Sequence, residues 1–346
     1  TVIAGGDGSV LSMIEGFKKD GIDINYCVFG HIPLGTGNDL SHCLGFGDCV
    51  DISDDINKLY KIVLRYYEAD FGKIDVWNMD LLLNEEDGEV LCNTKNGKKK
   101  LLDEKGGVLK RYNRTFINYL SLGYDARIGY NFDKQRTNSR FHNKCVYFCE
   151  GLKKILCRKT MTVQHFLDTF TVYESPNNTV NESTFFDVQE QNTENEKIKF
   201  QFRSKYSKTK NLLPNNKELR IKGDPCSIIF QNIHMYMSGI TDIWGNAKLK
   251  KSLSILDDIV EDKKKYEKKM EKMGLEKQRS DDKKLEVFTF DNGLETGFEK
   301  VRSGHAKQVY HGRGPMEIKF FETPSYNKHD RKNRVYLNVD GEYFHI

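Results

Sequence analysis

Two glycine-containing loops within the first 40 residues constrain the fold of this chain more than any other feature. The first, residues 5–9 (Gly-Gly-Asp-Gly-Ser), joins a short apolar segment at 1–4 to a helical pattern at 10–19. The second, residues 33–39 (Pro-Leu-Gly-Thr-Gly-Asn-Asp), follows an apolar segment at 25–32 and precedes a short helix. Strand, glycine loop and helix, repeated twice, predict an α/β domain. In such domains ligands bind beyond the C-terminal ends of the strands, where both loops fall.

The residue types in both loops suit a nucleotide phosphate. Glycines let backbone N–H groups approach phosphate oxygens, and the start of the following helix adds a partial positive charge. Neither loop is a Walker loop, because no Gly-Lys-Ser/Thr sequence is present. The candidate nucleotide-binding residues are Gly5, Gly6, Gly8, Ser9, Gly35, Thr36, Gly37 and Asn38.

Asp7 lies between the glycines of the first loop, where its charge would repel a phosphate. It makes sense there if Mg²⁺ bridges it to the nucleotide, or if it takes the proton of an attacking hydroxyl. The alternative is a tight turn in which Asp7 or Ser9 caps the helix, and Asn38 or Asp39 could cap the next helix in the same way.

The pattern changes after the first 70 residues. With 346 residues the chain is long enough for two domains. Residues 73–83 read as a strand, and from residue 115 onward the pattern is mostly that of strands. We therefore predict an α/β nucleotide-binding domain at 1–70 and a mostly β domain at 71–346. Polar stretches predict exposed insertions near residues 84–113, 177–195 and 261–284.

Composition excludes several classes of protein. A formal net charge of +4 is too small to indicate nucleic acid as a partner. The eight cysteines form no Cys-x-x-Cys pair, which argues against a zinc ribbon and favours free thiols in a reducing compartment. The sequence shows neither a signal peptide nor an apolar run of about 20 residues. We expect a cytoplasmic location, and we interpret the start at Thr1, inside a strand, as the truncated end of a longer polypeptide.

One basic segment stands out. Residues 127–159 hold nine Lys and Arg against two acidic residues, and helical spacing places Phe148 and Leu152 on one face. Such a helix can lie on an anionic membrane leaflet. The alternative is an ordinary helix that packs on its own domain with solvated lysines.

The two loops together resemble the catalytic domain of diacylglycerol kinases. The motif at 5–8 is shared with phosphofructokinases and NAD kinases, whereas Pro-Leu-Gly-Thr-Gly-Asn-Asp-Leu at 33–40 narrows the resemblance to the diacylglycerol and sphingosine kinases. Further stretches resemble the accessory domain of the eukaryotic diacylglycerol kinases: Asn-Tyr-Leu-Ser-Leu-Gly-Tyr-Asp-Ala at 118–126, Arg-Phe-His-Asn-Lys at 140–144, Gln-Asn-Ile at 231–233, Asp-Ile-Trp-Gly at 242–245, Asp-Lys-Lys-Leu-Glu-Val at 282–287 and Val-Asp-Gly-Glu at 339–342.

The resemblance implies a nucleotide-binding α/β domain followed by a β-sandwich. It also implies a lipid kinase in which ATP and diacylglycerol meet between the two domains and phosphatidic acid is the product. By motif position, Asp7 would belong to the phosphate and Mg²⁺ site, and Thr36 and Asn38 would contact the nucleotide. Asp125 would lie by the acceptor hydroxyl as a candidate general base, and Glu342 would return from the C-terminus to the metal. Which of Asp7 and Asp125 takes the proton stays open. The implied partners are diacylglycerol or a related lipid and a membrane surface that recruits the protein peripherally.

The chain departs from the family pattern at three places. Ser9 replaces the usual Thr, the loop at 237–239 (Met-Ser-Gly) keeps one of two glycines, and the family's first strand and phosphate loop precede Thr1. Three alternatives therefore stay open: a sphingoid or ceramide kinase, an NAD kinase or phosphofructokinase, and a catalytically silent lipid-binding or scaffolding module of the same fold.

Overall fold

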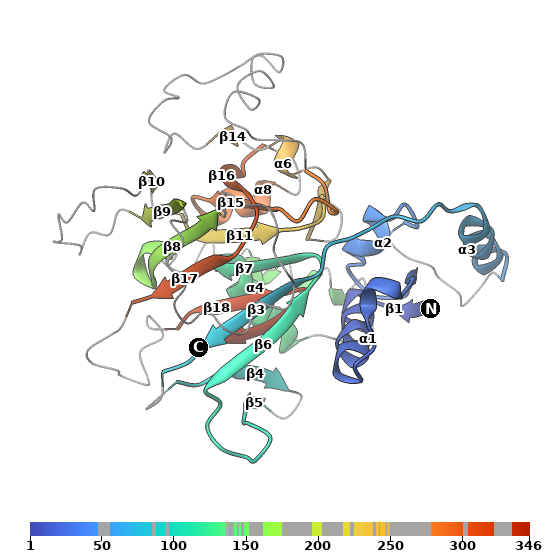
Figure 1. Cartoon of the computed structure of the whole chain (residues 1–346), viewed down its shortest axis with the longest axis horizontal. Coiled ribbons are helices and arrows are strands. Elements are labelled where there is room, and N and C mark those ends of the chain that lie inside the picture. Colours follow the sequence, from blue (N-terminus) through green and yellow to red (C-terminus); the bar gives the residue numbers. More distant parts are fainter. Residues whose placement is uncertain are drawn as a thin grey trace.

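Figure 1 shows the computed structural model of the chain. It describes residues 1–47, 56–84, 88–94, 97–135, 162–174, 196–202, 217–221, 225–237, 278–299, 304–321 and 334–346, with short pieces at 137, 142–143, 145–146, 149–151, 240–241, 243–246 and 248–249. Several predictions lie outside the described residues: the insertion at 177–195, most of that at 261–284, the Ser238-Gly239 loop and the second half of the basic segment. No helix in the described part of the chain is both long and apolar enough to cross a membrane.

The N-terminal elements form an α/β unit, as predicted. They are β1 (Val2–Gly5), α1 (Asp7–Lys19), η1 (Ile24–Tyr26), β2 (Gly30–Pro33), α2 (Asp39–Cys43) and α3 (Ile56–Glu68). β1 and β2 pair in parallel, with Gly5 opposite Pro33 at their C-terminal ends. α1 buries Val10, Leu11 and Ile14, which fall on one face at helical spacing. The glycine loops that follow β1 and β2 therefore lie at the same edge of this small sheet.

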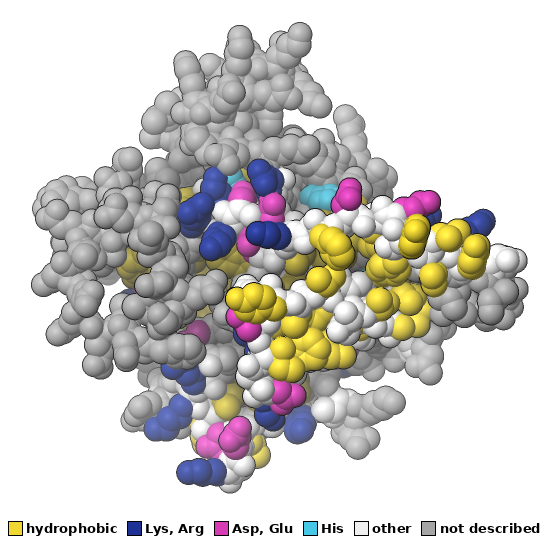
Figure 2. Space-filling view, turned by 45° about the vertical axis from the view of Figure 1, so that its right-hand side comes forward, with side chains coloured by type: hydrophobic (Ala, Val, Ile, Leu, Met, Phe, Trp, Pro, Cys, Tyr) yellow, Lys and Arg dark blue, Asp and Glu magenta, His cyan; other side chains and the backbone are white. Residues whose placement is uncertain are grey.

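This unit has a small core and a largely apolar surface. Its buried cluster contains Ile3, Val10, Ile14 and Leu40, together with Ile117 from the β-rich part of the chain. Figure 2 shows hydrophobic side chains gathered over this side of the molecule. Most of the exposed large hydrophobic residues among those described lie between residues 2 and 71, with Tyr26, Tyr67 and Phe71 more than four-fifths exposed.

The β-rich part is built around a sheet of nine strands in the order β14-β16-β15-β11-β7-β18-β19-β4-β5. Its strands are β4 (Leu91–Thr94), β5 (Gly97–Lys100), β7 (Tyr119–Gly123), β11 (Ser227–Gln231), β14 (Lys248–Leu249), β15 (Leu285–Phe290), β16 (Lys307–Gly312), β18 (Tyr336–Val339) and β19 (Glu342–His345). β7, β11, β15 and β18 are buried along their whole length. They form the centre of the sheet, as Figure 1 shows.

A second sheet of four strands packs on the first through a common core. Its order is β10-β9-β8-β17, from β8 (Leu167–Glu174), β9 (Glu196–Phe202), β10 (Lys217–Ile221) and β17 (Met316–Phe320). Phe170 of β8 meets Phe230 of β11 edge to face, with ring centroids 5.3 Å apart. One apolar cluster contains residues of both sheets, which agrees with the predicted mostly β region.

The stretch at 84–113, predicted to be an exposed hairpin tip or insertion, lies between two paired strands and contains a hairpin of its own. β3 (Trp77–Leu82) pairs with β6 (Arg111–Phe116), and the β4–β5 hairpin between them joins the large sheet through β19. The end of the predicted insertion at 261–284 is also packed, since Gln278 is buried. The remaining described elements are α4 (Tyr124–Asp133), η2 (Val163–His165), β12 (Met235–Tyr236), β13 (Ile240–Thr241), α6 (Ile243–Asn246) and α8 (Gly293–Phe298).

Candidate active site

The two glycine loops touch each other at the C-terminal ends of β1 and β2. A Cβ atom on Gly35 would lie 2.5 Å from the Cα of Gly6, so a larger residue would push the loops apart. The N–H of Leu34 donates to the carbonyl of Gly5 at 2.8 Å. Asn38 closes its own loop: its side chain accepts from the N–H of Gly35 and donates to the carbonyl of Gly35, both at 3.0 Å. The loops thus form one continuous backbone surface at the start of α1.

Asp7 lies at this junction as the first residue of α1, whose N-cap is Gly6. Its Oδ2 atom accepts hydrogen bonds from the N–H of Asp39 at 2.8 Å and the side-chain amide of Asn118 at 3.1 Å. Its Oδ1 atom is buried and has no hydrogen-bond partner among the described residues. Burial raises the pKa of Asp7 to about 6, against the lowering effect of these hydrogen bonds.

His31 faces the same carboxylate from β2. Its Nε2 lies 3.0 Å from the carbonyl oxygen of Gly5, which accepts hydrogen bonds only, so Nε2 carries the proton of the neutral ring. Its Nδ1 then offers a lone pair, 3.9 Å from Oδ1 of Asp7. Burial lowers the pKa of His31, which favours this neutral ring. Two acceptor atoms face each other here, an arrangement that suits a cation or a proton.

Asp340 reaches the site from the other end of the chain. Asp340 and Gly341 both have positive φ angles, 48° and 84°, in the tight turn between β18 and β19. The Asp340 carboxylate accepts hydrogen bonds from the N–H groups of Ile117, Asn118 and Tyr119 at 2.7, 3.0 and 2.8 Å. Burial raises its pKa to about 7, and the negative charge of Asp7 adds to the rise.

Asn118 connects these two carboxylates. The backbone N–H of Asn118 donates to Asp340, and the side-chain amide of Asn118 donates to Asp7. Asn232 stabilises the chain segment next to Asn118, because its side-chain amide donates to the carbonyls of Ile117 and Asp75 at 2.7 and 2.9 Å. Residues from four distant parts of the sequence thus meet at one buried polar junction.

Asp125 lies in a different environment. It is in the first turn of α4 and only 3% exposed. Its carboxylate accepts hydrogen bonds from the hydroxyls of Ser121 and Tyr236. Burial raises its pKa. Ser121 lies three residues after Asn118, a distance of about 10 Å in extended chain, so the chain segment that binds Asp7 through Asn118 binds Asp125 at a different point.

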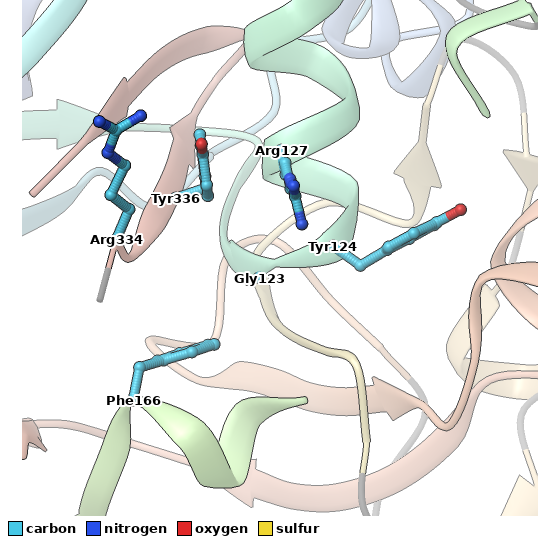
Figure 3. Close-up of a pocket in the computed structure, with 6 residues that line it drawn as sticks. All are labelled: Gly123, Tyr124, Arg127, Phe166, Arg334 and Tyr336. Carbon is cyan, nitrogen blue, oxygen red and sulfur yellow. The ribbon is translucent and has the colours of Figure 1, made fainter. Parts of the chain in front are cut away.

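A small pocket opens beside this turn of α4. Figure 3 shows its lining from three parts of the chain: Gly123, Tyr124, Arg127, Phe166, Arg334 and Tyr336. The guanidinium of Arg127 lies over the ring of Tyr336, 5.7 Å from its centroid. The pocket is therefore aromatic with basic groups at its edge.

The other predicted site residues are placed as follows. Glu342 is about half exposed and forms an ion pair with Arg114, which also binds Glu15. Ser9 is exposed, and its N–H bonds to the carbonyl of Gly6 at 2.9 Å. Thr36 is partly exposed in the second loop. The structure brings the glycines of both loops together with Asp7, while Asp125 and Glu342 lie outside that junction.

Three residues at the junction had no assigned role at the level of sequence. His31 is 1% exposed, as expected of an ordinary core residue in an apolar strand, but its ring also faces Asp7. Asn118 and Asp340 belong to the stretches at 118–126 and 339–342, where nothing local distinguishes them from their neighbours. The Asp-Gly pair at 340–341 was a usable signal, because Asp-Gly between apolar residues marks a tight hairpin turn.

Comparison with known proteins agrees with these observations. The family model of the diacylglycerol kinase catalytic domain matches residues 1–73, and that of the diacylglycerol kinase accessory domain matches residues 115–343, more than half of the chain. Diacylglycerol kinase 4 of Arabidopsis thaliana is 24% identical over 326 residues, which cover 89% of this chain and 56% of that protein. Diacylglycerol kinase iota of Mus musculus is 31% identical over 165 residues, 45% of this chain and 14% of that protein.

The chain thus spans at most about half of the length of these relatives. Among solved structures, a diacylglycerol kinase from Bacillus anthracis is similar with a TM-score of 0.36 and 12% identity, covering 99% of this chain and 69% of that one.

Proposed function

Because this chain belongs to the diacylglycerol kinase family, we propose that it transfers the γ-phosphoryl group of ATP to the free hydroxyl of diacylglycerol and releases phosphatidic acid. In this proposal residues 1–70 bind ATP and residues 71–346 bind the lipid. The substrate resides in a membrane, so the protein would act as a cytoplasmic enzyme recruited peripherally to the membrane surface.

One observation carries the proposal: the two glycine loops meet at a buried carboxylate that keeps one oxygen atom without a hydrogen bond. The two loops approach so closely that a Cβ atom on Gly35 would lie 2.5 Å from the Cα of Gly6, so the backbone at this point carries no side chain on either loop. The N-terminus of α1 adds its partial positive charge at the same point. These features support binding of the ATP phosphates by Gly5, Gly6, Gly8 and Ser9, with Gly35, Thr36 and Gly37 on the facing loop. Asn38 supports the second loop from within.

The residues present fit a Mg²⁺ ion that arrives with ATP. Among the described residues no cluster of three His, Cys, Asp or Glu side chains could hold a metal alone. Mg²⁺ in kinases needs no such cage, since it is bound by one or two carboxylates with substrate phosphates and water. The unpaired oxygen of Asp7, next to the charge of Asp340, offers that kind of site. When bound, Mg²⁺ would neutralise charge on the transferring phosphoryl group.

The hydroxyl proton also needs an acceptor, and we assign it to the Asp7–Asp340 pair. Their pKa values of about 6 and about 7 lie near neutral pH, where a general base is most effective. The Asp125 carboxylate accepts hydrogen bonds from Ser121 and Tyr236. Ser121 lies three residues along the chain from Asn118, the hydrogen-bond partner of Asp7. We assign to Asp125 the support of the α4 turn. Glu342 would bind the metal only if its ion pair with Arg114 were broken.

The test is transfer of labelled phosphate from MgATP to lipid in mixed micelles, with diacylglycerol and sphingosine as parallel acceptors. We expect labelled phosphatidic acid, and a loss of about two orders of magnitude or more in rate for Asp7→Asn. Asp80→Asn is the matched control, because Asp80 pairs with Arg111 at an exposed site and should leave the rate unchanged.

Product with sphingosine alone would indicate a sphingoid kinase. A folded protein that phosphorylates neither lipid would contradict the proposal and favour a silent lipid-binding module.

A further inference from the structure

We propose that Arg114 is a positioning residue of this site: it holds α1, and through α1 the carboxylate of Asp7, in place against the strand that leads to Asn118. The kinetic part of this inference rests on the proposed function. The structural part does not depend on it.

Arg114 joins three elements through one guanidinium group. It lies in β6 and its side chain is 18% exposed. Its Nη1 donates to Glu15 of α1 at 3.1 Å, and its Nη2 donates to Glu342 of β19. A planar guanidinium can bind two carboxylates in fixed directions, which an ammonium group does less well.

Further polar contacts fix the same end of α1. The N–H of Thr115 donates to the second oxygen of Glu15 at 3.2 Å. Lys18, one turn further along, donates to the side chain of Asn78 at 2.8 Å. The C-terminal half of α1 is therefore docked on β6 and on its partner strand β3.

The other end of α1 is docked on the same segment. Asp7 accepts from Asn118, four residues after Arg114. Eight helical residues from Asp7 to Glu15 span about 12 Å, and four extended residues from Arg114 to Asn118 span about 13 Å. The helix and the strand segment therefore run antiparallel with matched spacing. Asp7 meets Asn118 at one end, and Glu15 meets Arg114 at the other.

Apolar packing fills the space between the two anchors. Ile117 belongs to the same buried cluster as Val10 and Ile14 of α1. Because α1 is rigid, a change of its angle at Glu15 would move Asp7 relative to Asn118. Displacements of about 1 Å at a reacting group can cost about a hundredfold in rate.

The experiment compares Arg114→Gln, Arg114→Lys and the control Arg111→Gln. Arg111 lies on the same strand but pairs with Asp80, away from α1. We expect Arg114→Gln to lower kcat at least about tenfold and to raise KM for MgATP as well, because Asp7, Gly8 and Ser9 all lie in the first turn of α1 and would move with it. Arg114→Lys should recover part of kcat, and Arg111→Gln should match the wild type.

Hydrogen exchange provides a readout that does not need activity. Arg114→Gln should speed amide exchange across residues 7–19 while leaving β7 and β11 protected. Glu15→Gln, a nearly isosteric change at the other partner, should reproduce both effects and replaces Arg114→Gln if that variant does not fold.

Wild-type kcat and exchange in Arg114→Gln and Glu15→Gln would overturn the inference, as would an equal effect of Arg111→Gln. An inactive wild-type protein would contradict the proposed function instead, and the exchange data would still decide the role of Arg114.

Discussion

Burial and hydrogen bonding act in opposite directions on the carboxylates of the site. Burial makes the charged form costly, while the N–H donors at Asp7 and Asp340 stabilise it. The result is a pair with pKa values of about 6 and about 7. The charge of Asp7 adds to the raised pKa of Asp340, so Asp340 loses its proton at a higher pH than Asp7. Neutral His31 adds a lone pair but no positive charge to this environment.

The pH dependence of catalysis follows from this pair. We expect kcat/KM for MgATP to rise as pH increases through about 6 to 7 and then to level off, because proton transfer and Mg²⁺ binding both need ionised carboxylates. Asp340→Asn removes the group that titrates near pH 7 and should leave a single transition near pH 6, that of Asp7. Initial rates between pH 5 and 9 would test this. A profile that is flat across that range would contradict the assignment.

At the scale of elements, the large sheet buries polar groups between its strands as well as an apolar core. Glu286 of β15 lies opposite His311 of β16. Its carboxyl is fully buried and accepts a hydrogen bond from Gln278 at 2.8 Å. Burial is the main cause that raises its pKa to about 9, and the charge of Asp282 adds to it. The folded sheet therefore favours a protonated Glu286.

Stability should accordingly depend on pH. The pKa of Glu286 is raised above its unfolded value of about 4.3, so its contribution is complete below that value and is lost as pH rises through about 9. We expect the free energy of unfolding of the wild type to fall between pH 5 and 9 more steeply than that of Glu286→Gln. Urea unfolding at several pH values would measure the difference. Parallel slopes for the two proteins would count against a buried neutral Glu286.

At the scale of the whole molecule, apolar burial is unevenly distributed. The two large sheets share an extensive core, whereas residues 1–71 surround a small cluster and expose many apolar side chains. A parallel pair of strands is normally covered on both faces. The docking of α1 through Arg114 and Asn118 compensates in part, because it anchors the α/β elements to the better packed sheet.

Because apolar burial is uneven, we expect amide protons to exchange at different rates in the two parts of the molecule. We expect amides of β1, β2 and α2 to exchange faster than those of β7, β11 and β15, because local opening costs less where little apolar surface is buried. Native-state hydrogen exchange in low denaturant would measure both groups. Equal protection of both groups would show that the whole chain unfolds as a single unit.

Local patterns in the sequence determined the two glycine loops, the α/β start and the mostly β remainder. Each depends on neighbours in the chain: glycines at strand ends, helical spacing in α1, and alternating apolar residues in the strands. The family resemblance includes the stretches at 118–126 and 339–342, and Asn118 and Asp340 of those stretches lie at the junction with Asp7. Only the tertiary structure decided how these pieces meet. The choice of Asp340 over Glu342 at the junction depends on a hairpin turn that aims one side chain at three N–H groups contributed from about 220 residues earlier in the chain.

Contacts between segments that are distant in sequence also explain why no role was predicted for His31, Asn118 or Arg114. A buried histidine and a strand arginine look the same in sequence whether or not a carboxylate lies opposite. Hydrogen bonds act over about 3 Å, so their partners are decided by packing between elements rather than by spacing along the chain. What the sequence determined by itself was therefore the set of chemical groups and the local elements that carry them. The tertiary structure decided which of those groups lie close enough to act together.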